Sequence, residues 1–117
     1  MAQILALVDD IFFQAKMQET ARKLGVELKI AGTGDALVAA VTDAPPALIL
    51  VDLNARQGPL AALEKLHAAG NQIPVIAFLS HVQVELAERA RAAGCAQVLP
   101  RSKFTQELAA ILQSAVS

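Results

Sequence analysis

Residues 47–54 read Ala-Leu-Ile-Leu-Val-Asp-Leu-Asn, and this stretch decides the fold class. Five consecutive apolar residues lead directly into a carboxylate, Asp52. An apolar run this short is typical of a strand buried on both faces, as in a parallel sheet covered by helices. A Pro-Pro pair precedes the stretch and a Gly-Pro pair follows it, which limits it to a short strand. Asp52 is therefore predicted to lie at the carboxyl end of a buried strand, the edge where open α/β sheets bind ligands.

The rest of the chain alternates between strand and helix patterns. Apolar side chains recur at helical spacing in five segments, with Gly25, Gly70 and Gly94 as stops for three of these helices and Thr33 or Asp35 as a cap for another. Alternating strands and helices joined by short loops imply a parallel sheet with right-handed crossovers. Four further strands are predicted, at residues 4–8, 26–31, 73–79 and 96–99; the second alternates apolar and polar residues, as expected of an edge strand.

The composition excludes several classes of protein. The 117 residues fit one domain, 1–117, and we expect no output domain because no linker or second core is visible. The formal charge of -1 comes without a basic stripe, which argues against nucleic-acid binding. No apolar run reaches the roughly 18 residues of a membrane helix, and no secretory signal is apparent. Cys95 is the lone cysteine and is expected to pack as a small apolar residue, so a cytoplasmic protein without disulfides is predicted.

Acidic residues follow two of the predicted strands directly. Asp9 and Asp10 follow the first strand, and Asp52 ends the third. If these strands are neighbours, as in the sheet order 2-1-3-4-5, the three carboxylates share one crevice. Clustered carboxylates repel one another, and Mg²⁺, which prefers oxygen ligands and often binds phosphate as well, would neutralise them. The corners at Ser80 and Arg101 would add a hydroxyl and a cation to this crevice.

Together these patterns resemble the receiver domains of bacterial two-component signalling, the family of the chemotaxis response regulator. The resemblance spans nearly the whole chain and implies a flavodoxin-like fold: a five-stranded parallel sheet of order 2-1-3-4-5 with five helices, in three α/β/α layers. The matching pieces are Leu7-Val8-Asp9-Asp10, Leu50-Val51-Asp52, Pro74-Val75-Ile76, Ala92-Ala93-Gly94 and the corner at Arg101.

The resemblance also implies roles for individual residues. Asp52 corresponds to the aspartate that accepts a phosphoryl group from a histidine kinase. Asp9 and Asp10 correspond to the acidic pair that holds Mg²⁺, and Asn54 to the residue whose backbone carbonyl joins the metal shell. Asp52 itself would be a fourth ligand. Attack by a carboxylate on phosphorus is nucleophilic catalysis, assisted by a metal and a cationic side chain.

Three positions depart from the family pattern. Where the family has Thr or Ser at the end of the fourth strand, an ungapped count gives Leu79, with Ser80 one residue later; we favour Ser80 as the hydroxyl group. Arg101-Ser102 replaces the family's Lys-Pro, so the charge is kept but the contact and the loop are expected to differ. Val98 stands where many receivers have a switching aromatic residue.

The expected function is a stand-alone receiver with no conventional enzyme activity beyond accepting a phosphoryl group and slowly losing it. Its partners would be a histidine kinase or phosphotransfer protein and a downstream protein that binds the fourth helix, fifth strand and fifth helix, around residues 84–112; we expect a monomer or weak homodimer. The alternative is a degenerate receiver, an interaction module that works without phosphorylation. A small flavodoxin-like enzyme or cofactor carrier is a more distant possibility. His81, beside Ser80, is read as a loop residue, although it could titrate near neutral pH or contact the phosphoryl group.

Overall fold

The computed structural model describes residues 3–80 and 83–116, which form a five-stranded parallel sheet flanked by helices. The strand order is β2-β1-β3-β4-β5, with every neighbouring pair parallel, so the predicted order 2-1-3-4-5 is confirmed. The second predicted strand lies at one edge, as its alternating pattern indicated. The strands are β1 (Ile4–Leu7), β2 (Leu28–Ala31), β3 (Leu48–Asp52), β4 (Val75–Leu79) and β5 (Gln97–Pro100).

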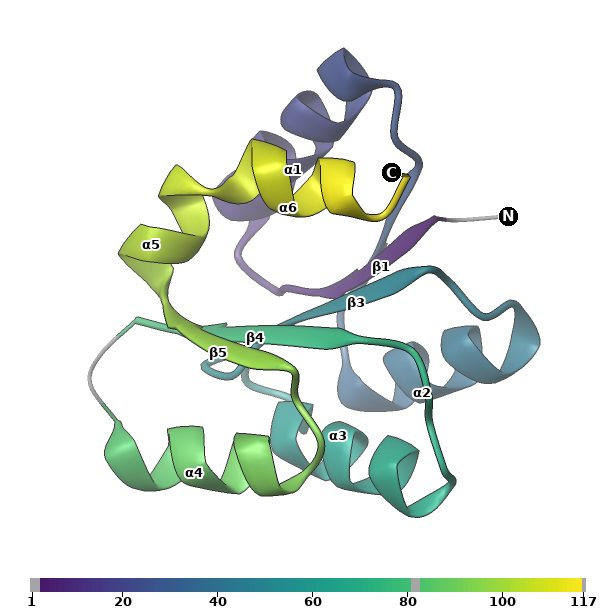
Figure 1. Ribbon diagram of the computed structural model, residues 1–117, viewed down its shortest axis with the longest axis vertical. Coiled ribbons are helices and arrows are strands. Elements are labelled where there is room, and N and C mark those ends of the chain that lie inside the picture. The colour runs from purple at the N-terminus through teal and green to yellow at the C-terminus, as the bar shows by residue number, and fades with distance from the viewer. Residues whose placement is uncertain (1–2, 81–82, 117) are drawn as a thin grey trace.

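Helices cover both faces of the sheet in the three-layer arrangement that the sequence predicts (Figure 1). On one face lie α1 (Ile11–Leu24), α5 (Arg101–Gln106) and α6 (Leu108–Ser114); on the other lie α2 (Gly34–Asp43), α3 (Pro59–Ala68) and α4 (Val84–Ala92). In the described residues, no helix is long and apolar enough to cross a membrane.

The last predicted helix is divided in two, which corrects the expected count of five helices to six in the described part of the chain. The division falls at Glu107, whose φ of -99° and ψ of 8° lie outside the helical range. Phe104 before the division and Leu108 after it are both buried. The change of direction therefore keeps the apolar stripe of this segment against the sheet on both sides of Glu107.

The core consists of two apolar clusters, one on each face of the sheet, because successive side chains of a strand point to opposite faces. All five residues of β3 are buried, as the continuous apolar run predicts. Phe13, Phe78 and Phe104 pack together on the α1 face, with the rings of Phe78 and Phe104 stacked at a centroid distance of 4.1 Å. Three of the four phenylalanines of the chain thus lie in one aromatic cluster.

Two residues that the sequence predicts to end or cap a helix are found in those positions. Gly25 ends α1 in the left-handed conformation, at a φ of 71°. Thr33 caps α2 by accepting a hydrogen bond from the Ala36 N–H, at 3.1 Å. The next residue, Gly34, is required for a different reason: a Cβ there would collide with the backbone carbonyl of Gly58. This close approach fixes the start of α2 against the loop that follows β3.

Candidate functional site

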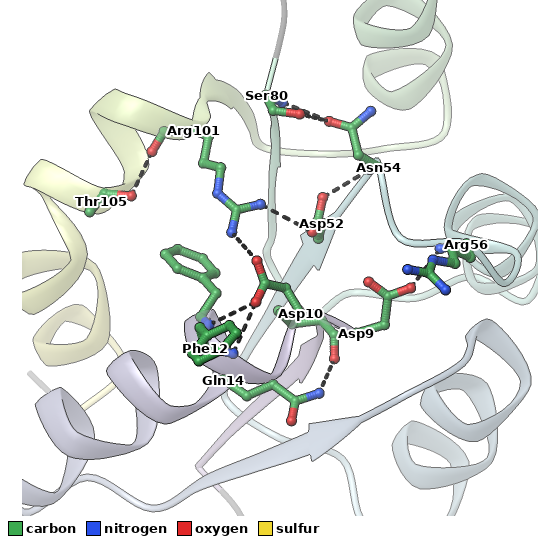
Figure 2. A network of polar contacts seen from close by, with 12 residues as sticks. Asp9, Asp10, Phe12, Gln14, Asp52, Asn54, Arg56, Ser80, Arg101 and Thr105 are labelled. Atoms are coloured by element: carbon green, nitrogen blue, oxygen red, sulfur yellow. Dashed lines mark hydrogen bonds and ion pairs between the residues drawn. The ribbon is translucent and has the colours of Figure 1, made fainter.

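The carboxyl ends of β1 and β3 lie side by side, and this brings Asp9, Asp10 and Asp52 to the same edge of the sheet. Leu7 of β1 is paired with Val51 of β3, so the residues that follow them emerge together. Figure 2 shows Arg101 reaching from the start of α5 toward the carboxylates of Asp10 and Asp52. The side chains of Asp10, Asp52 and Arg101 meet there, whereas the Asp9 carboxylate is bonded to the backbone of Arg56.

Asp52 is the last residue of β3 and is only 3% exposed. Its Oδ1 accepts a hydrogen bond of 2.9 Å from the Asn54 N–H, and its Oδ2 lies 3.6 Å from Nη1 of Arg101. Burial raises the pKa of Asp52, because it disfavours the charged form; the Asn54 N–H and the Arg101 charge partly offset this effect. Asp9 and Asp10 push the pKa of Asp52 further up by repulsion.

The Asp10 carboxylate makes two kinds of contact. It caps α1, since its Oδ1 accepts hydrogen bonds from the N–H groups of Phe12 (2.9 Å) and Phe13 (3.2 Å). Its Oδ2 accepts a hydrogen bond from Nη2 of Arg101, at 3.1 Å. The Phe13 N–H is the main cause of a lowered pKa for Asp10, and the Phe12 N–H and Arg101 act in the same direction. The helix cap uses Oδ1 and the ion pair uses Oδ2, so Asp10 makes both contacts at the same time.

Asp9 points away from Arg101 and accepts a hydrogen bond of 2.8 Å from the backbone N–H of Arg56 (Figure 2). Among the described residues, no three His, Cys, Asp or Glu side chains are grouped closely enough to form a metal site by themselves. The donor chemistry of Asp9, Asp10, Asp52 and the Asn54 carbonyl is nevertheless that of a hard cation site, since all the donors are oxygens. The residue types fit Mg²⁺, while their present contacts are with protein groups.

Ser80 and Asn54 are directly joined. The N–H and the hydroxyl of Ser80 both donate to Oδ1 of Asn54, at 2.6 and 2.8 Å, and the Asn54 side-chain amide donates to Gln83 at 2.8 Å. Leu79 ends β4 and is buried in the apolar cluster. Of the two candidates, Ser80 therefore carries a polar group at this edge, and it faces the Asn54 side chain. His81 lies outside the described residues.

Arg101 is held by an aromatic ring as well as by the two carboxylates. Its guanidinium carbon lies 4.2 Å from the centroid of Phe13, close enough for a cation–π contact. Sequence reasoning placed Phe13 only in the core stripe of α1 and did not foresee this contact, nor the parts played by Gln83 and Arg56. The position of Phe13, three residues after Asp10 and in the first turn of a helix, was the one sequence feature that could have indicated this contact.

A hollow of about 440 Å³ lies next to the site, between α4 and β5. Ser80 and Arg101 border it on the site's side, and Val84 and Val98 are among its mainly apolar lining. The hollow adjoins the position where Val98 replaces the aromatic residue that the family resemblance implies. Val98 is one of the residues that line this space.

Cys95 packs with the cluster beneath α2, α3 and α4, as expected of a small apolar residue. Burial raises the pKa of its thiol to about 11. A thiol with this pKa carries almost no thiolate at neutral pH and is a poor nucleophile. Cys95 is therefore structural and takes no part in the site.

Comparison with known proteins identifies the fold. No family model and no curated protein matches the sequence. Among solved structures, the chain is similar to the receiver domain of NtrX from Brucella abortus, with a TM-score of 0.80, 23% identity and 96% of each chain covered. The chemotaxis response regulator CheY4 of Vibrio cholerae gives a TM-score of 0.81 at 21% identity, with 98% of each chain covered.

A third similar structure is that of the phosphorylated cyanobacterial phytochrome response regulator RcpA, with a TM-score of 0.83 at 16% identity, covering 100% of this chain and 96% of that one. At these identities the likeness establishes the fold. It agrees with the strand order and the three layers described above. The chain has the fold of the response-regulator receiver domains.

Proposed function

We propose that this protein is a receiver of two-component signalling that accepts a phosphoryl group on Asp52. One observation carries the proposal: within residues 3–80 and 83–116, Asp52 is the only polar or charged residue that is fully buried. Burying a carboxylate is unfavourable unless it is paired or used, and this one lies at the ligand-binding edge of the sheet. The similarity to RcpA, a response regulator whose structure is that of a phosphorylated protein, supports the same reading.

The reaction would be an in-line transfer from a phosphohistidine of a kinase or phosphotransfer protein. A carboxylate oxygen of Asp52 attacks phosphorus, the O–P bond forms, the N–P bond breaks, and the histidine leaves and takes up a proton. Arg101 would contact a phosphoryl oxygen, as guanidinium groups do. Ser80 would donate its hydroxyl to another oxygen after giving up its present contact with Asn54.

Mg²⁺ is the cofactor that we propose for this step, held by Asp10 and Asp52 directly, by the Asn54 carbonyl, and by Asp9 through water. When bound, it would neutralise charge on the transferring phosphoryl oxygens. The all-oxygen donor set supports this assignment.

A small acyl phosphate provides a direct test. The protein is incubated with acetyl phosphate and Mg²⁺, and intact mass followed by peptide mapping reports any phosphoryl group and its position. We expect one group, on Asp52, and none in Asp52→Asn. Asp43→Asn is the matched control, because Asp43 is an exposed aspartate at the end of α2. No gain in mass, or an equal gain in Asp52→Asn, would refute the proposal.

A second candidate function is favoured by a specific observation. Arg101 already pairs with both Asp10 and Asp52, and Asp10 also caps α1, so the acidic edge is satisfied by protein groups. A receiver in this state could act as an interaction module without phosphorylation. Failure of the acetyl phosphate reaction would support this candidate. A measurable Mg²⁺ affinity that is lost in Asp10→Ala would count against it.

For the downstream partner we propose the surface formed by α4, β5 and α5. Three features support this choice: β5 is an edge strand, Val84 of α4 is 62% exposed, and the hollow beside Val98 opens there. Exposed apolar groups around a hollow are typical of protein-binding surfaces. We also propose a cytoplasmic location, where histidine kinases of this signalling system deliver their phosphoryl groups and where an unpaired cysteine stays reduced.

A further inference from the structure

The guanidinium of Arg101 lies between the two carboxylates that the proposed metal would use. Nη2 is 3.1 Å from Oδ2 of Asp10, and Nη1 is 3.6 Å from Oδ2 of Asp52 (Figure 2). Two different nitrogens thus contact two different carboxylates. A planar, permanently charged fork is the group best suited to bridge them.

The remaining oxygens of these carboxylates are already in use. Oδ1 of Asp10 accepts two backbone N–H groups at the start of α1, and Oδ1 of Asp52 accepts the Asn54 N–H. The other oxygen of each carboxylate, Oδ2, is the one that Arg101 contacts. Because Oδ1 of Asp10 already accepts two hydrogen bonds, a divalent ion bound by Asp10 would have to share or take over the Oδ2 that Arg101 contacts.

Arg101 is also fixed from its other sides. β5 ends at Pro100 and α5 begins at Arg101, so no flexible loop separates it from the sheet. Its carbonyl accepts a hydrogen bond from the Thr105 hydroxyl at 2.8 Å, and its guanidinium lies on the Phe13 ring. Its side chain is only 28% exposed. The guanidinium is held in place before any ligand arrives.

We infer that Arg101 is a built-in counter-cation of the acidic edge, which competes with divalent metal ions for Asp10 and Asp52. This inference rests on the proposed function, because the metal site is the same one. It adds that metal binding displaces the guanidinium, and that the edge is charge-balanced without metal. The contacts of Arg101 with the partly exposed Asp10 and the buried Asp52 must be broken or shared for the metal to enter. We expect this to weaken metal binding about tenfold, equivalent to about 1.4 kcal/mol.

Titration with Mn²⁺ tests the inference without any phosphodonor. Free Mn²⁺ is followed by electron paramagnetic resonance, and Mg²⁺ is then added as a competitor. Arg101→Met keeps the aliphatic stem on Phe13 but removes the charge, and we expect it to bind Mn²⁺ about tenfold more tightly than the wild type. Lys103→Met is the matched control, because it removes an exposed positive charge two residues away; we expect its affinity to stay within about twofold of the wild type.

Thermal unfolding supplies a second readout. In EDTA, Arg101→Met should unfold at a lower temperature than the wild type, since its carboxylates are left without a cation; added Mn²⁺ should raise its Tm more than that of the wild type. Arg101→Lys should fall between the two, because a point charge cannot bridge both carboxylates as a fork does. If Arg101→Met folds poorly, Arg101→Lys is compared with the wild type in its place.

Equal or weaker Mn²⁺ binding by Arg101→Met, relative to the wild type, would overturn the inference. So would an equal gain in affinity in Lys103→Met, since the effect would then reflect net charge alone. The phosphoryl acceptor role of Asp52 is tested separately by the acetyl phosphate reaction. A wild-type protein that gains the phosphoryl group while Arg101→Met binds Mn²⁺ no more tightly would refute only the competition.

Discussion

Replacing the buried carboxylate of Asp52 with an amide should stabilise the protein at neutral pH. Asn has nearly the same shape and keeps an oxygen that can accept the Asn54 N–H, which lies 2.9 Å from Oδ1 in the wild type. What the variant loses is the ion pair with Arg101, which at 3.6 Å and with a 28% exposed partner contributes about 0.5–1 kcal/mol. The Asp52→Asn substitution also removes two unfavourable effects, the burial of a charge and the repulsion of that charge by Asp9 and Asp10.

Because burial is the largest cause of the raised pKa of Asp52, the removed cost should outweigh the lost ion pair. We expect a net gain of about 1 kcal/mol in the free energy of unfolding, because Arg101 keeps its ion pair with Asp10 and is not left as a buried, unpaired charge. For a chain of 117 residues, this corresponds to a rise in Tm of about 4 °C.

The gain should depend on pH. A raised pKa means that the folded state holds a proton on Asp52 at pH values where the unfolded chain has lost it, so the wild type loses stability as pH rises through this window. The advantage of Asp52→Asn is therefore complete above the raised pKa and disappears below the ordinary aspartate range. Urea unfolding at pH 7.5 and at several lower values measures it, with Asp43→Asn as an exposed control. An Asp52→Asn protein less stable than the wild type at pH 7.5 would show that the Arg101 pair outweighs burial.

Three further outcomes are expected. Asp10→Ala should lower the free energy of unfolding by about 1 kcal/mol more than Asp10→Ser does, because serine can still cap α1. Chemical denaturation of both variants measures the difference, and equal losses would refute the capping role. Gly34→Ala should lower the free energy of unfolding by about 1–3 kcal/mol, because the added Cβ meets the Gly58 carbonyl. Gly32→Ala, with open space around the added Cβ, should change it by under about 0.5 kcal/mol. Similar Tm values for the two variants would contradict the close approach. Cys95 should react with iodoacetamide at pH 8 roughly two orders of magnitude more slowly than a cysteine peptide, since its pKa is about 11; a rate equal to the peptide's would show an exposed thiol.

The sequence predicts the fold well because the strands of a buried parallel sheet are continuous apolar runs. The strand at residues 47–54, the edge strand before it and the glycine stop at Gly25 follow from local patterns that nothing else in the chain overrides. The division of the last helix at Glu107 was missed because the apolar spacing from Phe104 onward fits one continuous helix. Where a backbone changes direction to keep both halves against a sheet, the cause lies in tertiary packing.

The acidic edge could be predicted as a set of residues but not as a set of contacts. That Asp9, Asp10, Asp52 and Arg101 lie at one edge of the sheet follows from the strand order. Which oxygen pairs with which donor depends on side-chain rotamers, and these are fixed by partners such as Phe13 and the backbone of Arg56 that no short motif specifies. The same reason explains why the link between Ser80 and Asn54 was not foreseen.

The ion pair between Arg101 and Asp10 joins residues that are 91 positions apart in the chain. Asp52 lies near the middle of that span, so the edge is built from the early, central and late parts of the chain. Contacts this distant in sequence form slowly, because a long loop must close before they contribute any stability. During synthesis on the ribosome, the aspartates would emerge well before their arginine, and the site would be completed only after β5 has joined the sheet.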